Sequence, residues 1–160
     1  MTFSDWLLFL HIASAFALVS ALVVYWSIAI AARNVERPVD SLRYFRIAKP
    51  ANVLIIVGTV GTLVFGIWLA IDFEAYQVWD GWILAAIVLW AISAGTGQRG
   101  GKNYNEAGKL VERLVTENRG AEPSPELRAR LTNRNAILLN VASSVAVLLI
   151  LIDMIYKPGV

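Results

Sequence analysis

Residues 6–32 decide the fold, and they read WLLFLHIASAFALVSALVVYWSIAIAA, with no Asp, Glu, Lys or Arg. A helix needs about 20 apolar residues to cross the roughly 30 Å hydrocarbon core of a bilayer. Three further uncharged runs, 51–71, 81–98 and 135–152, approach or reach this length. In lipid the backbone must satisfy its own hydrogen bonds, so each run is predicted to be a helix. The sequence therefore predicts an all-α polytopic membrane four-helix bundle.

The composition supports a membrane protein. Hydrophobic residues make up 58% of the 160-residue chain and charged residues 16%, against about 25% charged in an average soluble domain. The chain begins with an acid and no base, and its first apolar run exceeds the about 7–15 residues of a signal peptide, so that run is predicted to be retained as a helix. The absence of cysteine excludes disulfides and thiolate metal sites. We expect one transmembrane domain over 1–160.

The basic residues predict the orientation. All Lys and Arg residues except Lys157 fall in two segments, 33–49 and 99–134. The charged residues of the connection 72–80 are all acidic. Lys and Arg accumulate on cytoplasmic loops near helix ends. We therefore expect a multi-pass protein of the bacterial cytoplasmic (inner) membrane, with the N-terminus and C-terminus outside. This placement accounts for the basic charge without a nucleic-acid partner.

The expected membrane helices cover about 5–32, 50–71, 80–98 and 134–156, with a cytoplasmic helical segment at about 103–118. That segment is amphipathic, and Ser124 with Pro125 predicts the start of another helix. We expect a helical hairpin that extends the third and fourth membrane helices, with an apolar seam of Leu110, Leu114, Leu127 and Leu131. The alternative is an amphipathic helix lying on the membrane surface.

The glycine-rich stretch 95–102 reads GTGQRGGK. It departs from the phosphate-loop pattern, which requires glycine where Thr96 stands and Ser or Thr where Asn103 stands. We expect it to be a flexible break where the third helix leaves the membrane.

Small residues recur every four positions on two helices. The stripes are Gly58, Thr62, Gly66 and Ala70 on the second helix, and Ala13, Ala17 and Ala21 on the first. Such stripes let helix backbones approach closely in lipid. They predict either packing within the bundle or the seam of a homodimer.

His11 is the candidate functional residue, because an ionisable side chain inside a membrane helix indicates function by default. Neutral imidazole binds heme iron or another metal. Met154 is the only thioether candidate for a second ligand, and Asp153 lies at a depth from which it could orient the imidazole. Otherwise a six-coordinate heme needs His11 from each of two subunits. The alternative is a histidine hydrogen-bonded between helices.

Polar residues in the runs lean toward the inner half of the bilayer. They are Asn52, Thr59, Thr62, Ser93, Thr96, Asn140, Ser143 and Ser144. They would either line a path for a small solute or hydrogen-bond between helices. Ion pathways usually contain ionisable residues, and none lies in this group.

Three motifs carry a resemblance to a known family. They are WLLFLHIA at 6–13, DMIYKPG at 153–159, and Gly58-x-x-Gly61-x-x-x-x-Gly66-Ile-Trp68. Together they resemble a bacterial family of predicted four-helix integral membrane proteins of unknown function. That family is similar in outline to copper-resistance D-type proteins and to the membrane protoporphyrinogen oxidase family, which place a histidine in the first helix. In the oxidase family this histidine and a membrane lysine are associated with heme b, and the present chain matches at His11 only.

No catalytic constellation is present in the sequence. We expect an accessory or oligomeric membrane component without catalysis of its own, with the lipid bilayer and a second copy or another membrane protein as partners. The alternative is a heme-b redox protein that uses His11, and the third possibility is a small-solute transporter.

Overall fold

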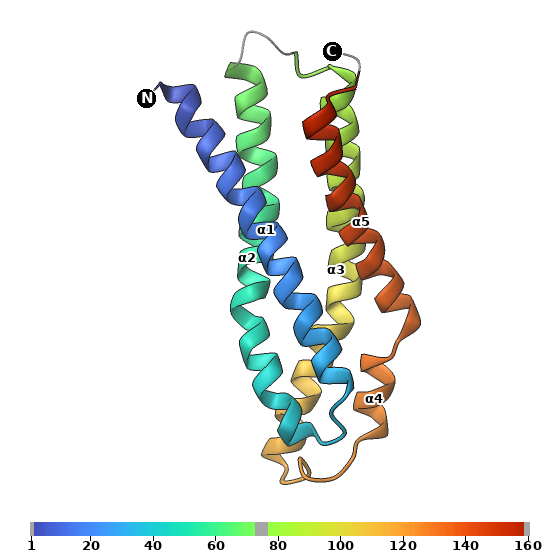
Figure 1. Cartoon of the computed structure of the whole chain (residues 1–160). Helices are drawn as coiled ribbons and strands as arrows, with labels where there is room; N and C mark the ends of the chain where they lie inside the picture. Colours follow the sequence, from blue (N-terminus) through green and yellow to red (C-terminus); the bar gives the residue numbers. More distant parts are fainter. Residues whose placement is uncertain (1, 73–76, 159–160) are drawn as a thin grey trace.

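The computed structural model describes residues 2–72 and 77–158, and within these ranges the chain is helical and without strands. The helices are α1 (Phe3–Arg33), α2 (Pro38–Asp72), α3 (Gly81–Thr116), α4 (Pro125–Leu131) and α5 (Arg134–Tyr156) (Figure 1). α1 packs along α2, α3 packs along α5, and α4 lies against α3 and α1. Glu74 and Gly159 lie outside the described residues.

The expected all-α class is confirmed. Among the described residues, four helical segments are long and apolar enough to cross a membrane. The predicted helix 134–156 agrees with α5, and the start predicted at Ser124 and Pro125 agrees with α4. Ser124 Oγ accepts a hydrogen bond from Leu127 N at 3.3 Å. Such caps satisfy amide groups that the first turn of a helix leaves unpaired.

α2 begins at Pro38, and the predicted start at residue 50 is wrong. Pro50 lies inside the helix, although an interior proline lacks an amide donor and clashes with the preceding turn. The helix continues because its first part packs on both sides of this position. Phe45, Ala48 and Ala51 are all buried. Tertiary packing outweighs the local cost of the proline here.

α3 runs without interruption from the apolar run into the segment predicted at 103–118, so the predicted break at 95–102 is wrong. Two of its glycines instead let α5 approach closely. A Cβ at Gly97 would lie 2.7 Å from Ser143 Oγ, and a Cβ at Gly100 would lie 2.7 Å from Asn140 Oδ1. The glycines therefore serve helix packing rather than a flexible joint.

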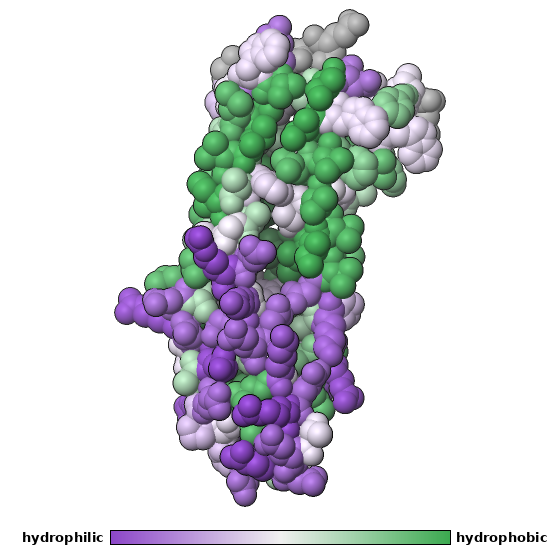
Figure 2. All heavy atoms as spheres, turned by 180° about the vertical axis from the view of Figure 1, so that it is seen from behind, coloured by the Kyte–Doolittle hydropathy of each residue, from purple (hydrophilic) through white to green (hydrophobic). Residues whose placement is uncertain are grey.

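The molecule has an apolar half and a polar extension. The extension consists of residues 33–49 and 99–134, which hold every Lys and Arg except Lys157. Figure 2 shows hydrophobic surface over one end of the molecule and hydrophilic surface over the other. α2 and α3 have 35 and 36 residues. At about 1.5 Å per residue they exceed a bilayer core of roughly 30 Å by about 20 Å.

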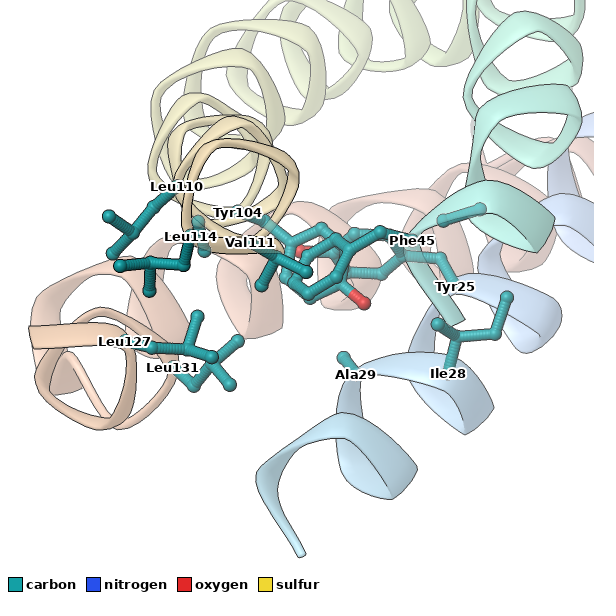
Figure 3. Packing of buried hydrophobic residues seen from close by; sticks show 12 residues of the cluster. Tyr25, Ile28, Ala29, Phe45, Tyr104, Leu110, Val111, Leu114, Leu127 and Leu131 are labelled. Carbon is teal, nitrogen blue, oxygen red and sulfur yellow. The ribbon is translucent and has the colours of Figure 1, made fainter. Parts of the chain in front are cut away.

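The main hydrophobic core lies in the extension and at its junction with the apolar half (Figure 3). Leu110 and Leu114 of α3 pack with Leu127 and Leu131 of α4 in this core, so the predicted hairpin seam is confirmed. The alternative of a helix lying on the membrane surface is wrong, because the apolar face of that segment is buried against protein.

Candidate functional site

His11 lies where α1 and α2 pack closely against each other. Its Nδ1 lies 3.0 Å from the carbonyl oxygen of Thr62. A Cβ at Gly66 would lie 2.8 Å from the imidazole Cε1, so the ring rests directly on this glycine. A carbonyl only accepts, so Nδ1 carries the proton in this contact. In the neutral ring Nε2 then keeps its lone pair.

The small-residue stripe of α2 allows this close packing. A Cβ at Gly58 would lie 2.7 Å from Leu18 N and 2.8 Å from Ser14 O, both backbone atoms of α1. Thr62 turns its hydroxyl back to Gly58 O at 2.8 Å. The close-packed part of the stripe is therefore filled by α1 of the same chain, which leaves no room there for a second copy.

The alanine stripe of α1 is divided between two environments. Ala21 is buried, Ala17 is half-buried and Ala13 is exposed. Ala70, at the far end of the α2 stripe, is half-buried. A homodimer seam that uses Ala13 stays a prediction.

The structure does not bring Met154 and Asp153 to His11. Both residues belong to α5, which packs along α3, whereas His11 packs on α2. The N-terminal turns of α1 and the C-terminal turns of α5 stand apart in Figure 1. Asp153 Oδ2 is buried and has no hydrogen-bond partner. Among the described residues no group of three His, Cys, Asp or Glu side chains could hold a metal ion.

The polar side chains that were considered as the lining of a solute path are hydrogen-bonded within the protein. Thr59, Thr62, Thr96, Asn140 and Ser144 donate to carbonyls of their own helices. Asn52 donates to Asn105. Ser93 and Ser143 pair across α3 and α5 at 3.1 Å. These partners support the hydrogen-bonding alternative over a path for a solute.

Two tryptophans join the helix pairs. Trp26 Nε1 on α1 donates to Ser144 Oγ on α5 at 2.9 Å, and Trp90 Nε1 on α3 donates to the carbonyl of Thr59 on α2 at 2.8 Å. The sequence analysis did not predict these links. A buried or half-buried indole N–H usually has a partner, and that rule was the available signal.

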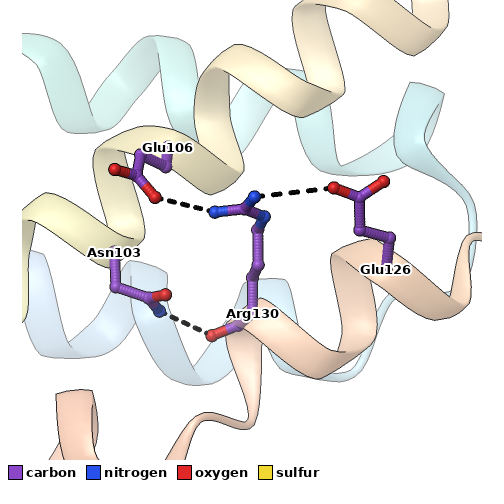
Figure 4. Close-up of polar contacts among 4 residues, drawn as sticks. All are labelled: Asn103, Glu106, Glu126 and Arg130. Atoms are coloured by element: carbon purple, nitrogen blue, oxygen red, sulfur yellow. Dashed lines mark hydrogen bonds and ion pairs between the residues drawn. The ribbon is translucent and has the colours of Figure 1, made fainter.

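A polar cluster holds α4 to α3. Arg130 Nη1 contacts Glu106 at 2.7 Å and Nη2 contacts Glu126 at 3.5 Å, while Asn103 donates to the Arg130 carbonyl at 2.7 Å (Figure 4). The Nε of Arg130 and the hydroxyl of Tyr104 are buried without a hydrogen-bond partner. An unpaired buried polar group costs about 1–3 kcal/mol.

Both unpaired groups belong to residues that line a small cavity of ≈ 20 Å³. Its lining comes from α1, α3, α4, α5 and the turn between α4 and α5, and includes Tyr25, Arg33, Gly100, Asn103, Tyr104, Arg130, Asn133 and Asn140. The sequence analysis missed this cavity. Tyr104 shares a helix face with Ala107 and Val111, and that spacing indicated burial.

Comparison of the chain with protein-family models, curated proteins and solved structures found no match. The resemblance to a four-helix membrane family therefore stays a prediction.

Proposed function

We propose that this protein is a multi-pass component of a bacterial cytoplasmic membrane that has an accessory or oligomeric role and no catalysis of its own. One observation carries the membrane assignment: large apolar side chains are exposed on all four long helices. Phe16 is 74% exposed on α1, Val57 57% on α2, Val88 58% on α3 and Leu148 57% on α5. Monomeric soluble proteins rarely expose contiguous apolar surface of this extent, so lipid or protein must cover it.

The charge distribution gives the proposed orientation. Every Lys and Arg except Lys157 lies in the extension. The extension would therefore lie in the cytoplasm, with both chain termini outside. A helical extension with its own core, carried by the ends of membrane helices, offers a water-exposed surface to a partner. The internal hydrogen bonds of the polar side chains support this role over solute transport.

Site-directed labelling tests the membrane assignment and the orientation. The chain has no cysteine, so Gln77→Cys and Glu122→Cys each introduce a unique thiol. Gln77 lies between α2 and α3, and Glu122 lies between α3 and α4 at the other end of the molecule. A membrane-impermeant maleimide should label the first variant in intact cells and the second only after permeabilisation. Reversed labelling contradicts the orientation, and recovery in the soluble fraction contradicts the membrane assignment.

A second candidate function, heme-b binding, is favoured by the His11 contact alone. A hydrogen bond from one ring nitrogen to a carbonyl is the arrangement that orients metal-binding histidines, and it leaves Nε2 as a possible ligand. The single chain does not fit a six-coordinate heme, because Met154 lies on a helix pair that His11 does not contact. A second axial ligand would have to come from another copy.

An absorption spectrum separates the two functions. A preparation purified from heme-supplemented cells should be colourless if His11 only packs helices. A Soret band that is present in the wild type and absent in His11→Asn would instead establish heme binding. Asn keeps a donor for the Thr62 carbonyl, and Gly95→Ala is the matched control, because a Cβ there meets no atom within 4 Å.

A further inference from the structure

Two residues that line the cavity between the apolar half and the extension have buried polar groups without a partner. Tyr104 is 8% exposed, and its hydroxyl has no partner. The Nε–H of Arg130 is also buried and unpaired. Burial raises the pKa of Tyr104 above its usual value of 10.0, so its hydroxyl stays a protonated donor at neutral pH. Buried donors normally have a hydrogen-bond partner, and an acceptor oxygen bound in the cavity would provide one for these two groups.

The same cavity is lined by a cation that has no carboxylate partner in the described part of the chain. Arg33 at the end of α1 lines it, and Arg33 forms no ion pair with a carboxylate of residues 2–72 or 77–158. Its charge acts on the Tyr104 hydroxyl electrostatically. Glu106 and Glu126 are bound to the terminal nitrogens of Arg130, so neither of them pairs with Arg33.

The cavity has a buried side and an open side. Tyr25, Gly100 and Tyr104 are buried, whereas Arg33 is half-buried and Asn133 is exposed. A volume of ≈ 20 Å³ accepts about one oxygen atom, so the rest of a larger group would lie in the mouth near Arg33. Two uncharged runs end, at residues 32 and 98, and a third begins, at residue 135, within two residues of the lining residues Arg33, Gly100 and Asn133.

We propose that this cavity binds one oxygen of a phosphate-type anion, with Tyr104 donating to it and Arg33 pairing with its charge. Two sources have this chemistry: the headgroup of an anionic phospholipid, and free phosphate. Basic pockets between membrane helices at the cytoplasmic interface are suited to lipid headgroups. The lipid source rests on the proposed membrane insertion, whereas binding of free phosphate does not.

Native mass spectrometry of the full chain in neutral detergent tests the proposal. The probes are phosphatidylglycerol, phosphatidylcholine and inorganic phosphate, each titrated separately. The expected result is a one-to-one phosphatidylglycerol adduct that binds about tenfold tighter than phosphatidylcholine. Arg33→Gln and Tyr104→Phe should each weaken this adduct about tenfold, as the loss of a charge-assisted hydrogen bond does.

Arg128→Gln is the matched control, because it removes the same charge from an exposed position in the extension that does not line the cavity. Far-UV circular dichroism checks that each variant keeps its helical content, and Tyr104→Phe retains the ring that packs on Phe45. Phosphate binding that depends on Arg33, without a lipid adduct, would assign the site to the free anion. Equal binding by the wild type and the Arg33 and Tyr104 variants would overturn the proposal and leave the cavity to a water molecule. Loss of membrane localisation in the labelling experiment would remove only the lipid source.

Discussion

The close approach of α1 and α2 at Gly58 gives the sharpest test of the fold. In Gly58→Ala the new methyl carbon would lie 2.7 Å from Leu18 N, 2.8 Å from Ser14 O and 2.9 Å from Leu18 Cα. Ordinary contacts of a Cβ begin at 3.4 Å. All three obstructing atoms are backbone atoms, so no rotamer change relieves the clash, and the helices must separate by about 0.7 Å.

The expected cost follows from this separation. Overpacking of a close-packed site typically costs about 1–3 kcal/mol. Alanine also gains about 1 kcal/mol over glycine in helix propensity, which partly hides the cost. Gly95→Ala on α3 carries the same propensity gain, and its Cβ meets no atom within 4 Å. The difference between the two variants therefore isolates the clash, and we expect Gly58→Ala to be less stable than Gly95→Ala by about 1–3 kcal/mol.

Reversible unfolding of the detergent-solubilised protein by dodecyl sulfate, followed by tryptophan fluorescence, measures this difference. The contact between α1 and α2 should break first in Gly58→Ala, because the clash acts on that pair. Equal stability of the two alanine variants would refute the close packing of α1 on the glycine stripe. It would also reopen that stripe as a seam between two copies.

Four further outcomes are expected. Leu127→Ala should destabilise the protein by about 2–5 kcal/mol in thermal unfolding, because Leu127 is 1% exposed in the core of the extension. Leu138→Ala, 54% exposed in the apolar half, should change stability by less than about 0.5 kcal/mol. Trp26→Phe removes the indole bond to α5 and should cost about 0.6 kcal/mol, and at most about 1.7 kcal/mol, in the dodecyl sulfate assay. A bond from Lys49 lowers the pKa of Glu112 below 4.5, so this pair stabilises the fold above that pH and stops doing so as the pH falls through the lowered pKa. In Glu112→Gln the fall in melting temperature between about pH 6 and about pH 3 should be smaller than in the wild type.

The class of the fold could be predicted because it depends on properties that are local to each segment. A long uncharged run indicates a membrane helix whatever its neighbours are, and a capping residue acts within one turn. This is why α5 agrees at both ends and why α4 begins where Ser124 predicts. The leucine seam of the extension was predictable for the same reason, since periodicity reveals which face of a helix is buried.

The two errors in the helix bounds lie at residues that disfavour an isolated helix. The second helix was expected to begin near residue 50, where the uncharged run starts, and the glycines at 95–102 were expected to form a flexible break. In the structure both segments stay helical where they pack against other helices. Phe45 and Ala48 are buried before the proline, and Gly97 and Gly100 receive side chains of α5. Residues that are poor for an isolated helix are tolerated or needed where another helix lies close.

The candidate sites also depend on contacts between helices, which the sequence of one segment does not reveal. His11 was identified because one histidine in an apolar run is conspicuous in the sequence, but its partners on α2 depend on the packing of two helices. Arg33 and Tyr104 were not identified, because each is ordinary in its own segment. Their significance appears only when α1 and α3 place a buried hydroxyl without a partner and a guanidinium without an acid around one cavity. A lone unusual residue can therefore prove to be packing, whereas ordinary residues from two helices together can form the stronger candidate for a binding site.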